Sequence, residues 1–243
     1  MAERQEATLL GPAKGSANPL HMHALVAEFL GTFFIEFFTG AITVVSATTG
    51  LVTGALGIGF SFVSMMFIFR GVSGAHLNPA VTIGVMASSP PLSYEFNLIQ
   101  GLAYIFCQLF GSVTGAVMIS HLIPMEADII DEPATEDSPA VHHKGSVTFM
   151  TRGVLSGDHG VSVFIFELVC TFAIVWAYFA TMIDTRSRRR TGGFGPVAVG
   201  LGIIVGVLAE GPGTGGLFLT LDQRALARAP ASSISSAVIF AVT

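Results

Sequence analysis

The stretch that decides the fold is Ser73-Gly74-Ala75-His76-Leu77-Asn78-Pro79-Ala80-Val81-Thr82-Ile83-Gly84, which lies between two long apolar segments. Asn is a preferred N-cap residue and Pro is favoured at the first helical position, so Asn78-Pro79 predicts the start of a helix. That helix, about residues 79–87, has under half of the roughly 20 residues that a bilayer crossing needs. Irregular polar backbone is tolerated at membrane depth only where protein surrounds it or it lines a watery cavity. The stretch therefore predicts a re-entrant pore element whose helix dipole repels cations, protons included.

Residues 73–82 resemble the first signature of the aquaporin, or major intrinsic protein, family over ten contiguous positions. The resemblance extends over about residues 24–216. It implies an all-α membrane protein, an inverted repeat of transmembrane helices with re-entrant half-helices. It also implies a passive channel, a homotetramer with one pore per subunit, and no cofactor. The alternative interpretation of the stretch is a chance N-capped helix on a protein surface.

The composition is that of an integral, multi-pass membrane protein. The chain has 243 residues, of which 51% are hydrophobic and only 11% are charged, whereas soluble domains average about 25% charged residues. Residues 1–23 predict a polar tail rather than a signal peptide, and residues 24–243 predict a single channel domain in the lipid bilayer. Cys107 and Cys170 fall within apolar segments, which predicts free thiols. No nucleic-acid partner is expected.

The apolar segments predict five membrane spans and a shortened sixth. The third span resembles that of the family over Tyr104-Ile105-Phe106-Cys107-Gln108-Leu109-Phe110-Gly111, with Gly115. The resemblance implies close contact with a neighbouring helix there, because small residues let backbones approach. Four arginines between residues 184 and 193 predict a cytoplasmic loop by the positive-inside rule. The N-terminus and Arg70 are then cytoplasmic too, and the acidic connection 122–158 is external. The five spans are expected at about residues 23–48, 51–69, 94–121, 161–183 and 194–209.

An internal repeat relates the two halves of the chain. Glu28-Phe29-Leu30-Gly31-Thr32-Phe33 is echoed by Glu167-Leu168-Val169-Cys170-Thr171-Phe172. Three spans separate the two copies, so the halves have opposite orientations in the membrane. Asn78 follows Glu28 by 50 residues. A second half-helix is therefore expected about 50 residues after Glu167, near Leu217.

Three carboxyl groups lie within predicted spans, where they are costly and should face the bundle. Glu28 and Glu167 match the glutamates that, by the family resemblance, brace the two pore loops. A proton relay, as in a pump, is the alternative interpretation. Glu36 stands where the family has an apolar residue. It is either an uncharged acid packed between subunits or a pore-facing group, and the sequence does not decide.

The resemblance also implies which groups line the path. Gly74, Ala75 and His76 would present backbone carbonyl groups that replace the hydrogen bonds of water. Asn78, Pro79 and Ala80 would form the half-helix tip beside them. His76 could instead be a metal ligand, but no second His or carboxyl group lies at ligand spacing beside it, so a loop-bracing histidine is the preferred interpretation and no metal is expected.

The outer constriction is located by spacing from the family motifs. Ile58 lies twenty residues before Asn78, and Val207 lies seven residues before Thr214. These positions often carry Phe and His in water-selective members of the family. Two aliphatic side chains would make a wider, less polar throat. The resemblance thus implies passage of water and small uncharged solutes such as glycerol, urea, ammonia or hydrogen peroxide.

The C-terminal part departs from the family pattern. Gly213-Thr214-Gly215-Gly216 is present, but no second Asn-Pro-Ala follows. Alignment on the glycines puts Asp222 at the filter arginine. The alignment we prefer puts Arg224 there, at the cost of a two-residue insertion. Residues 231–243 would span about 20 Å as a helix, against about 30 Å of hydrocarbon. We hypothesise that the terminus is truncated or read out of frame from about Leu217, which transcript sequencing tests.

Three functions are compatible with these features. The first is a passive aquaporin-like channel. The second is a non-conducting relative that assembles with complete channels as a structural or regulatory subunit. The third is an ion- or proton-coupled transporter built on Glu28, Glu36 and Glu167. An enzyme is not expected, because the sequence shows no nucleophile–base pair, metal cluster or phosphate-binding loop.

Overall fold

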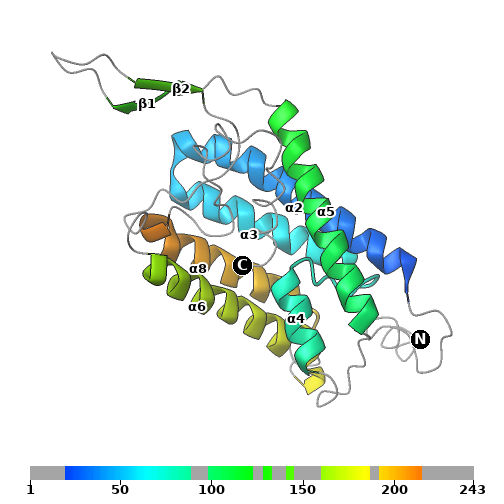
Figure 1. Cartoon of the computed structure of the whole chain (residues 1–243). Helices are drawn as coiled ribbons and strands as arrows, with labels where there is room; N and C mark the ends of the chain where they lie inside the picture. The colour runs from blue at the N-terminus through cyan, green and yellow to red at the C-terminus, as the bar shows by residue number, and fades with distance from the viewer. Residues whose placement is uncertain are drawn as a thin grey trace.

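The computed structural model describes residues 20–88, 98–122, 128–132, 141–144, 160–186 and 192–214. In this part of the chain the structure is helical apart from one short hairpin (Figure 1). The helices are α2 (Met22–Thr49), α3 (Leu51–Phe69), α4 (Pro79–Ser88), α5 (Leu98–Leu122), α6 (Gly160–Tyr178), the π-helical turn η1 (Phe179–Ile183) and α8 (Gly195–Thr214). The strands are β1 (Asp128–Glu132) and β2 (Val141–Lys144).

The long helices pack as a row, and the short helix α4 contacts the helices at both ends of that row. Along this row α5 contacts α2, α2 contacts α3, α3 contacts α8, and α8 contacts α6 (Figure 1). Helix α4 contacts both α5 and α6, which are the two ends of the row. The half-helix therefore bridges the first and last helices of the row.

The predicted spans agree with the observed helices in number and in most of their bounds. Four helices in the described part of the chain are long and apolar enough to cross a membrane, and the apolar stretch of α8, Gly195–Ala209, is shorter. Helix α5 begins at Leu98, and residues 89–97 lie outside the described part. The predicted fourth span ends in the π-helical turn η1, and α8 continues to Thr214, beyond the predicted end at residue 209.

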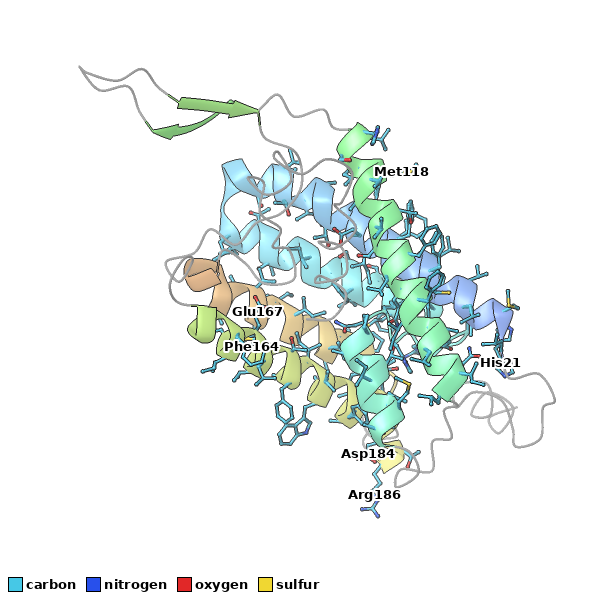
Figure 2. The ribbon with its side chains drawn as sticks, viewed as in Figure 1. His21, Met118, Phe164, Glu167, Asp184 and Arg186 are labelled. Carbon is cyan, nitrogen blue, oxygen red and sulfur yellow. The ribbon has the colours of Figure 1, made fainter. Side chains whose placement is uncertain are left out.

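Contacts between helix ends show that the two halves run in opposite directions. At the start of α2, the His21 N–H donates to Oε1 of Gln100, near the start of α5. Arg70, at the end of α3, donates to the carbonyl oxygen of Gly193, just before α8. Figure 2 shows that His21 and Asp184 lie toward the same end of the bundle. Helix α6 thus ends where α2 begins, as the internal repeat predicts.

Glycine permits the closest helix crossing, between α2 and α5. A Cβ at Gly111 would lie 2.3 Å from the carbonyl oxygen of Phe29, and one at Gly115 would lie 2.5 Å from that of Phe33. Both distances are far below van der Waals contact, so the two backbones touch at these points. The prediction of close helix contact at Gly111 and Gly115 is confirmed.

A second glycine crossing joins α3 of the first half to α8 of the second. A Cβ at Gly59 would lie 2.8 Å from the carbonyl oxygen of Gly200, and a Cβ at Gly200 would lie 2.9 Å from that of Gly59. The pair is reciprocal, which is the geometry of two helices touching through their backbones. The sequence analysis did not single out either glycine, because they lie 141 positions apart (200 minus 59).

The predicted loops lie only partly within the described residues, and the predicted C-terminal segment lies outside them. The connection 122–158, expected as a loop, contains the antiparallel pair β1–β2, in which Asp128 is opposite Lys144. Most of the N-terminal tail lies outside the described part of the chain. So does everything after Thr214, which includes Arg224, the expected second half-helix and residues 231–243.

We predict that Gly111→Ala lowers the stability of the fold by about 1–3 kcal/mol, the usual cost of overpacking, because the new methyl group meets backbone. For a chain of this size each kcal/mol corresponds to about 2–4 °C in the thermal midpoint, measured by fluorescence in detergent micelles. Gly71→Ala is the matched control, since a Cβ at Gly71 meets nothing within 4 Å. Equal midpoints for the two variants would contradict the packing argument.

Candidate functional site

The candidate site is the re-entrant segment, residues 73–78, together with the half-helix α4 that follows it. Helix α4 has ten residues and is therefore about 15 Å long, half of the hydrocarbon thickness. The Asn78 Oδ1 accepts the N–H of Ala80 at 2.7 Å. This is the predicted N-cap, with Pro79 at the first helical position. The dipole of α4 therefore directs its positive end at the re-entrant segment.

Glu28 of α2 fixes the re-entrant segment from one side. Its carboxyl group is fully buried and accepts four hydrogen bonds. Two come from backbone N–H groups, of His76 at 3.1 Å and of Leu77 at 2.7 Å. The others come from the Ser73 hydroxyl and from Nε2 of Gln108, the latter at 2.7 Å. One side chain thus satisfies buried donors from the loop and from α5.

These hydrogen bonds hold an unusual backbone. Ala75 has φ of 54° and Leu77 has φ of 48°, in the left-handed region that non-glycine residues rarely adopt. Such a conformation costs about 1–3 kcal/mol per residue and persists only where the surroundings determine it. The N–H of Ala75 is bound by the Ser73 hydroxyl at 3.0 Å, and the next two N–H groups are bound by Glu28. Every N–H from 75 to 77 therefore has a side-chain acceptor.

The side chain of His76, in the re-entrant segment, is buried among α4, α5 and α6. Its Nδ1 lies 3.2 Å from the Thr82 hydroxyl, which also accepts Nε2 of Gln108 at 2.9 Å. The same Gln108 amide donates to Glu28, so the network runs from His76 through Thr82 and Gln108 to the carboxyl group. The His76 ring also meets the rings of Tyr104 and Tyr178 edge-on, at centroid distances of 5.2 and 5.7 Å.

Two tyrosines bind backbone carbonyl groups of the segment. The Tyr104 hydroxyl of α5 donates to the carbonyl oxygen of Ser73 at 3.0 Å. The Tyr178 hydroxyl of α6 donates to the carbonyl oxygen of Gly74 at 2.8 Å. The Gly74 carbonyl, which the sequence analysis placed on the solute path with those of Ala75 and His76, is thus tied to the second half of the chain.

The sequence analysis missed the partners of these groups. It named neither Thr82 nor Tyr178 as functional, and it cited Gln108 and Tyr104 only as part of a close-packed span. One signal was available, because a buried carboxyl group such as Glu28 requires donors and an apolar span offers few of them. Gln108 is such a donor in α5. Which donor turns toward Glu28 follows only from how the helices pack.

Of the two positions considered for Glu36, the one between subunits does not fit the structure. Glu36 is buried within a single chain and so cannot be an exposed group between subunits. Its carboxyl group lies between α2 and α5, where the Ser112 hydroxyl donates to it at 3.4 Å, and a Cβ at Gly115 would lie 3.0 Å from its Cβ. Burial follows from the narrow α2–α5 crossing, because Gly115 leaves room there for the side chain of the facing helix.

The remaining candidate residues are placed less completely. Glu167 is half-buried on α6 (Figure 2), and the segment it was expected to brace lies outside the described residues. Ile58 of α3 and Val207 of α8 are each 3% exposed and belong to one cluster of buried apolar side chains. The structure thus brings these two predicted throat residues into the same region. Cys107 and Cys170 are half-buried thiols that are not joined in a disulfide, as expected.

The sequence is similar to those of known proteins over most of its length. A family model described as "Major intrinsic protein" matches residues 16–239, past the point near residue 216 where the resemblance was expected to end. The curated relative "Aquaporin TIP4-4" of Zea mays is 29% identical over 215 residues, which cover 85% of this chain and 75% of the relative. "Aquaporin NIP3-1" of Arabidopsis thaliana is 30% identical over 195 residues, covering 79% of this chain and 54% of the relative.

We predict that Glu28→Gln destabilises the fold much more than Glu36→Gln does. A glutamine at 28 presents one acceptor oxygen and an NH₂ group to four donors, so at least one buried N–H loses its partner at a cost of about 1–3 kcal/mol. A glutamine at 36 keeps an oxygen for the one hydrogen bond from Ser112. The thermal midpoints of the two variants in micelles test this, and a similar loss for both would contradict the bracing role of Glu28.

Proposed function

Because this chain belongs to the major intrinsic protein family, we propose that it is a passive channel for water and small uncharged solutes. It is a membrane channel protein and not an enzyme. The observation that supports the proposal most directly is the half-helix α4, which starts at the N-cap Asn78 and whose re-entrant segment is held by Glu28. Water, glycerol, urea, ammonia and hydrogen peroxide are the proposed solutes.

The proposed path offers acceptors and donors in sequence. The carbonyl oxygens of Gly74, Ala75 and His76 would accept hydrogen bonds from a passing molecule and so replace part of its hydration. At Asn78 the Oδ1 is engaged in the cap, and the Nδ2 donors are the part of the amide that a solute oxygen would meet. The dipole of α4 raises the energy of a cation at this point, so the path favours neutral molecules.

The proposed throat is formed by aliphatic side chains. Ile58 and Val207 come from opposite halves of the chain and lie in one apolar cluster. Neither side chain can hydrogen-bond a solute, so these two side chains would discriminate by size alone. In this proposal Arg224 supplies the cation of the filter and Glu167 braces the second re-entrant segment. Size-based discrimination would admit glycerol and urea beside water.

We also propose that the end of the molecule that carries Arg70 and Arg186 faces the cytoplasm, and that the channel is a homotetramer. Arg70 binds Gly193 at this end, and Arg186 lies just after η1 there (Figure 2), so these two arginines are on one side, as the positive-inside rule requires. Four subunits per particle, measured as the mass of the protein in micelles, would support the tetramer.

The orientation predicts a labelling pattern. Arg186→Cys, at an exposed position (Figure 2), should react with a membrane-impermeant maleimide only after the cell membrane is opened. His121→Cys, exposed at the opposite end of α5, should react on intact cells. Both variants are made with Cys107 and Cys170 replaced by Ser. The reverse pattern would overturn the proposed orientation.

A second candidate function is a non-conducting subunit that assembles with complete channels. The absence of a second Asn-Pro-Ala sequence supports it, since the donor amide of the second half is then missing. Co-expression with a complete channel of the family distinguishes the two functions. An altered permeability or trafficking of that channel, together with no conductance by this chain alone, would favour the subunit.

We predict that the purified chain raises the permeability of proteoliposomes to water, glycerol and urea above that of empty vesicles, measured by stopped-flow light scattering. Ile58→Phe should lower glycerol permeability at least about tenfold relative to water, because a pocket discriminates by roughly that factor for small changes in size. Ile68→Phe is the matched control, since it makes the same change at an exposed position of α3. Vesicles no more permeable than empty ones would overturn the channel proposal.

A further inference from the structure

The two tyrosine hydroxyls make equivalent hydrogen bonds to adjacent residues of the re-entrant segment. Tyr104 binds the carbonyl oxygen of Ser73, and Tyr178 binds that of Gly74. Both tyrosines are almost completely buried, and both rings pack edge-on against His76. They differ in the carbonyl group that they bind, because only the Gly74 carbonyl belongs to the proposed solute path.

Tyr178 also differs in its origin, since it belongs to the second half of the chain. Helix α6 packs directly on α4 next to this residue: a Cβ at Gly84 would lie 3.2 Å from Val175 and 3.1 Å from Phe179. Val175 of α6 and Phe179, the first residue of η1, lie on either side of Tyr178 in the sequence. The glycine in α4 therefore lets α6 approach closely enough for the Tyr178 hydroxyl to reach the Gly74 carbonyl.

The helix changes its hydrogen-bonding pattern just after Tyr178. The N–H of Asp184 donates to the carbonyl oxygen of Phe179 at 2.9 Å, five residues earlier, which closes the π-helical turn η1. A π turn holds one more residue than an α turn and is frequent at functional sites. The π turn thus allows Tyr178 to face Gly74 while the chain after it turns toward α8. There the Thr181 hydroxyl approaches the Gly195 carbonyl oxygen.

We propose that Tyr178 is a positioning residue of the conduction path, which acts through the Gly74 carbonyl and sets the discrimination between glycerol and water. The inference rests on the proposed channel function. A carbonyl oxygen has two lone pairs, so the bond from Tyr178 leaves one acceptor site and fixes its direction. The three hydroxyl groups of glycerol need several fixed acceptors at the same time. A water molecule instead binds the carbonyl oxygens one after another. Glycerol therefore depends more strongly on each fixed carbonyl.

The experiment compares Tyr178→Phe with Tyr104→Phe in proteoliposomes. Each variant removes one buried hydroxyl and keeps the ring against His76. The readout is the ratio of glycerol to water permeability, which does not depend on the amount of folded channel. Tyr178→Phe should lower this ratio about two- to tenfold, the range that corresponds to one net hydrogen bond. Tyr104→Phe should leave the ratio at the wild-type value, because Ser73 is outside the path.

A conducting wild type with an unchanged ratio in Tyr178→Phe would overturn the inference alone, as would an equal shift in both variants. A wild type that conducts nothing would overturn both the inference and the channel function. Should Tyr178→Phe not fold, 3-fluorotyrosine incorporated at position 178 keeps the ring and makes the hydroxyl a stronger donor. It should raise the ratio, and no change would overturn the inference.

Discussion

The hydrogen bonds from the re-entrant segment to Glu28 are the interaction on which the rest of the structure depends. Three successive N–H groups in this segment cannot join a helix or a sheet, and two of their residues have positive φ. At membrane depth no bulk water is present to bind such groups. One buried carboxyl group accepts two of these N–H groups together with Ser73 and Gln108. Without this carboxyl group, the N–H groups of the strained backbone would be buried with no hydrogen-bond acceptor.

The half-helix can enter the bundle because the surrounding helices close around it. Helix α4 bridges α5 and α6, and each of these helices ties one carbonyl of the re-entrant segment through a tyrosine. The two halves also meet where Gly59 and Gly200 touch and where Arg70 binds Gly193. The re-entrant segment is therefore stabilised by residues of both repeats. Together with the family match, these contacts confirm the predicted aquaporin-like fold, which in its described part is helical apart from the β1–β2 pair.

Local chemistry explains which features could be predicted from the sequence. The N-cap at Asn78, the length of the half-helix and the spans follow from residues close in the chain, since capping and hydrophobic length are local properties. The β1–β2 pair, the π turn after Tyr178 and the position of Glu36 were not foreseen. None of them follows from capping or from the length of an apolar segment. Glu36 shows this most clearly, because its burial depends on the absence of a side chain at Gly115.

The sequence by itself determined that the chain spans a membrane, that its halves are inverted, and that a short capped helix interrupts the first half. These properties follow from the composition, the lengths of the apolar segments, the internal repeat and a contiguous motif. Only the tertiary structure decided which donors reach Glu28 and which hydroxyls hold the Ser73 and Gly74 carbonyls. The physical reason is that hydrogen bonds act over about 3 Å, so pairs such as Glu28 and Gln108, 80 residues apart, are selected by helix packing and leave no local pattern.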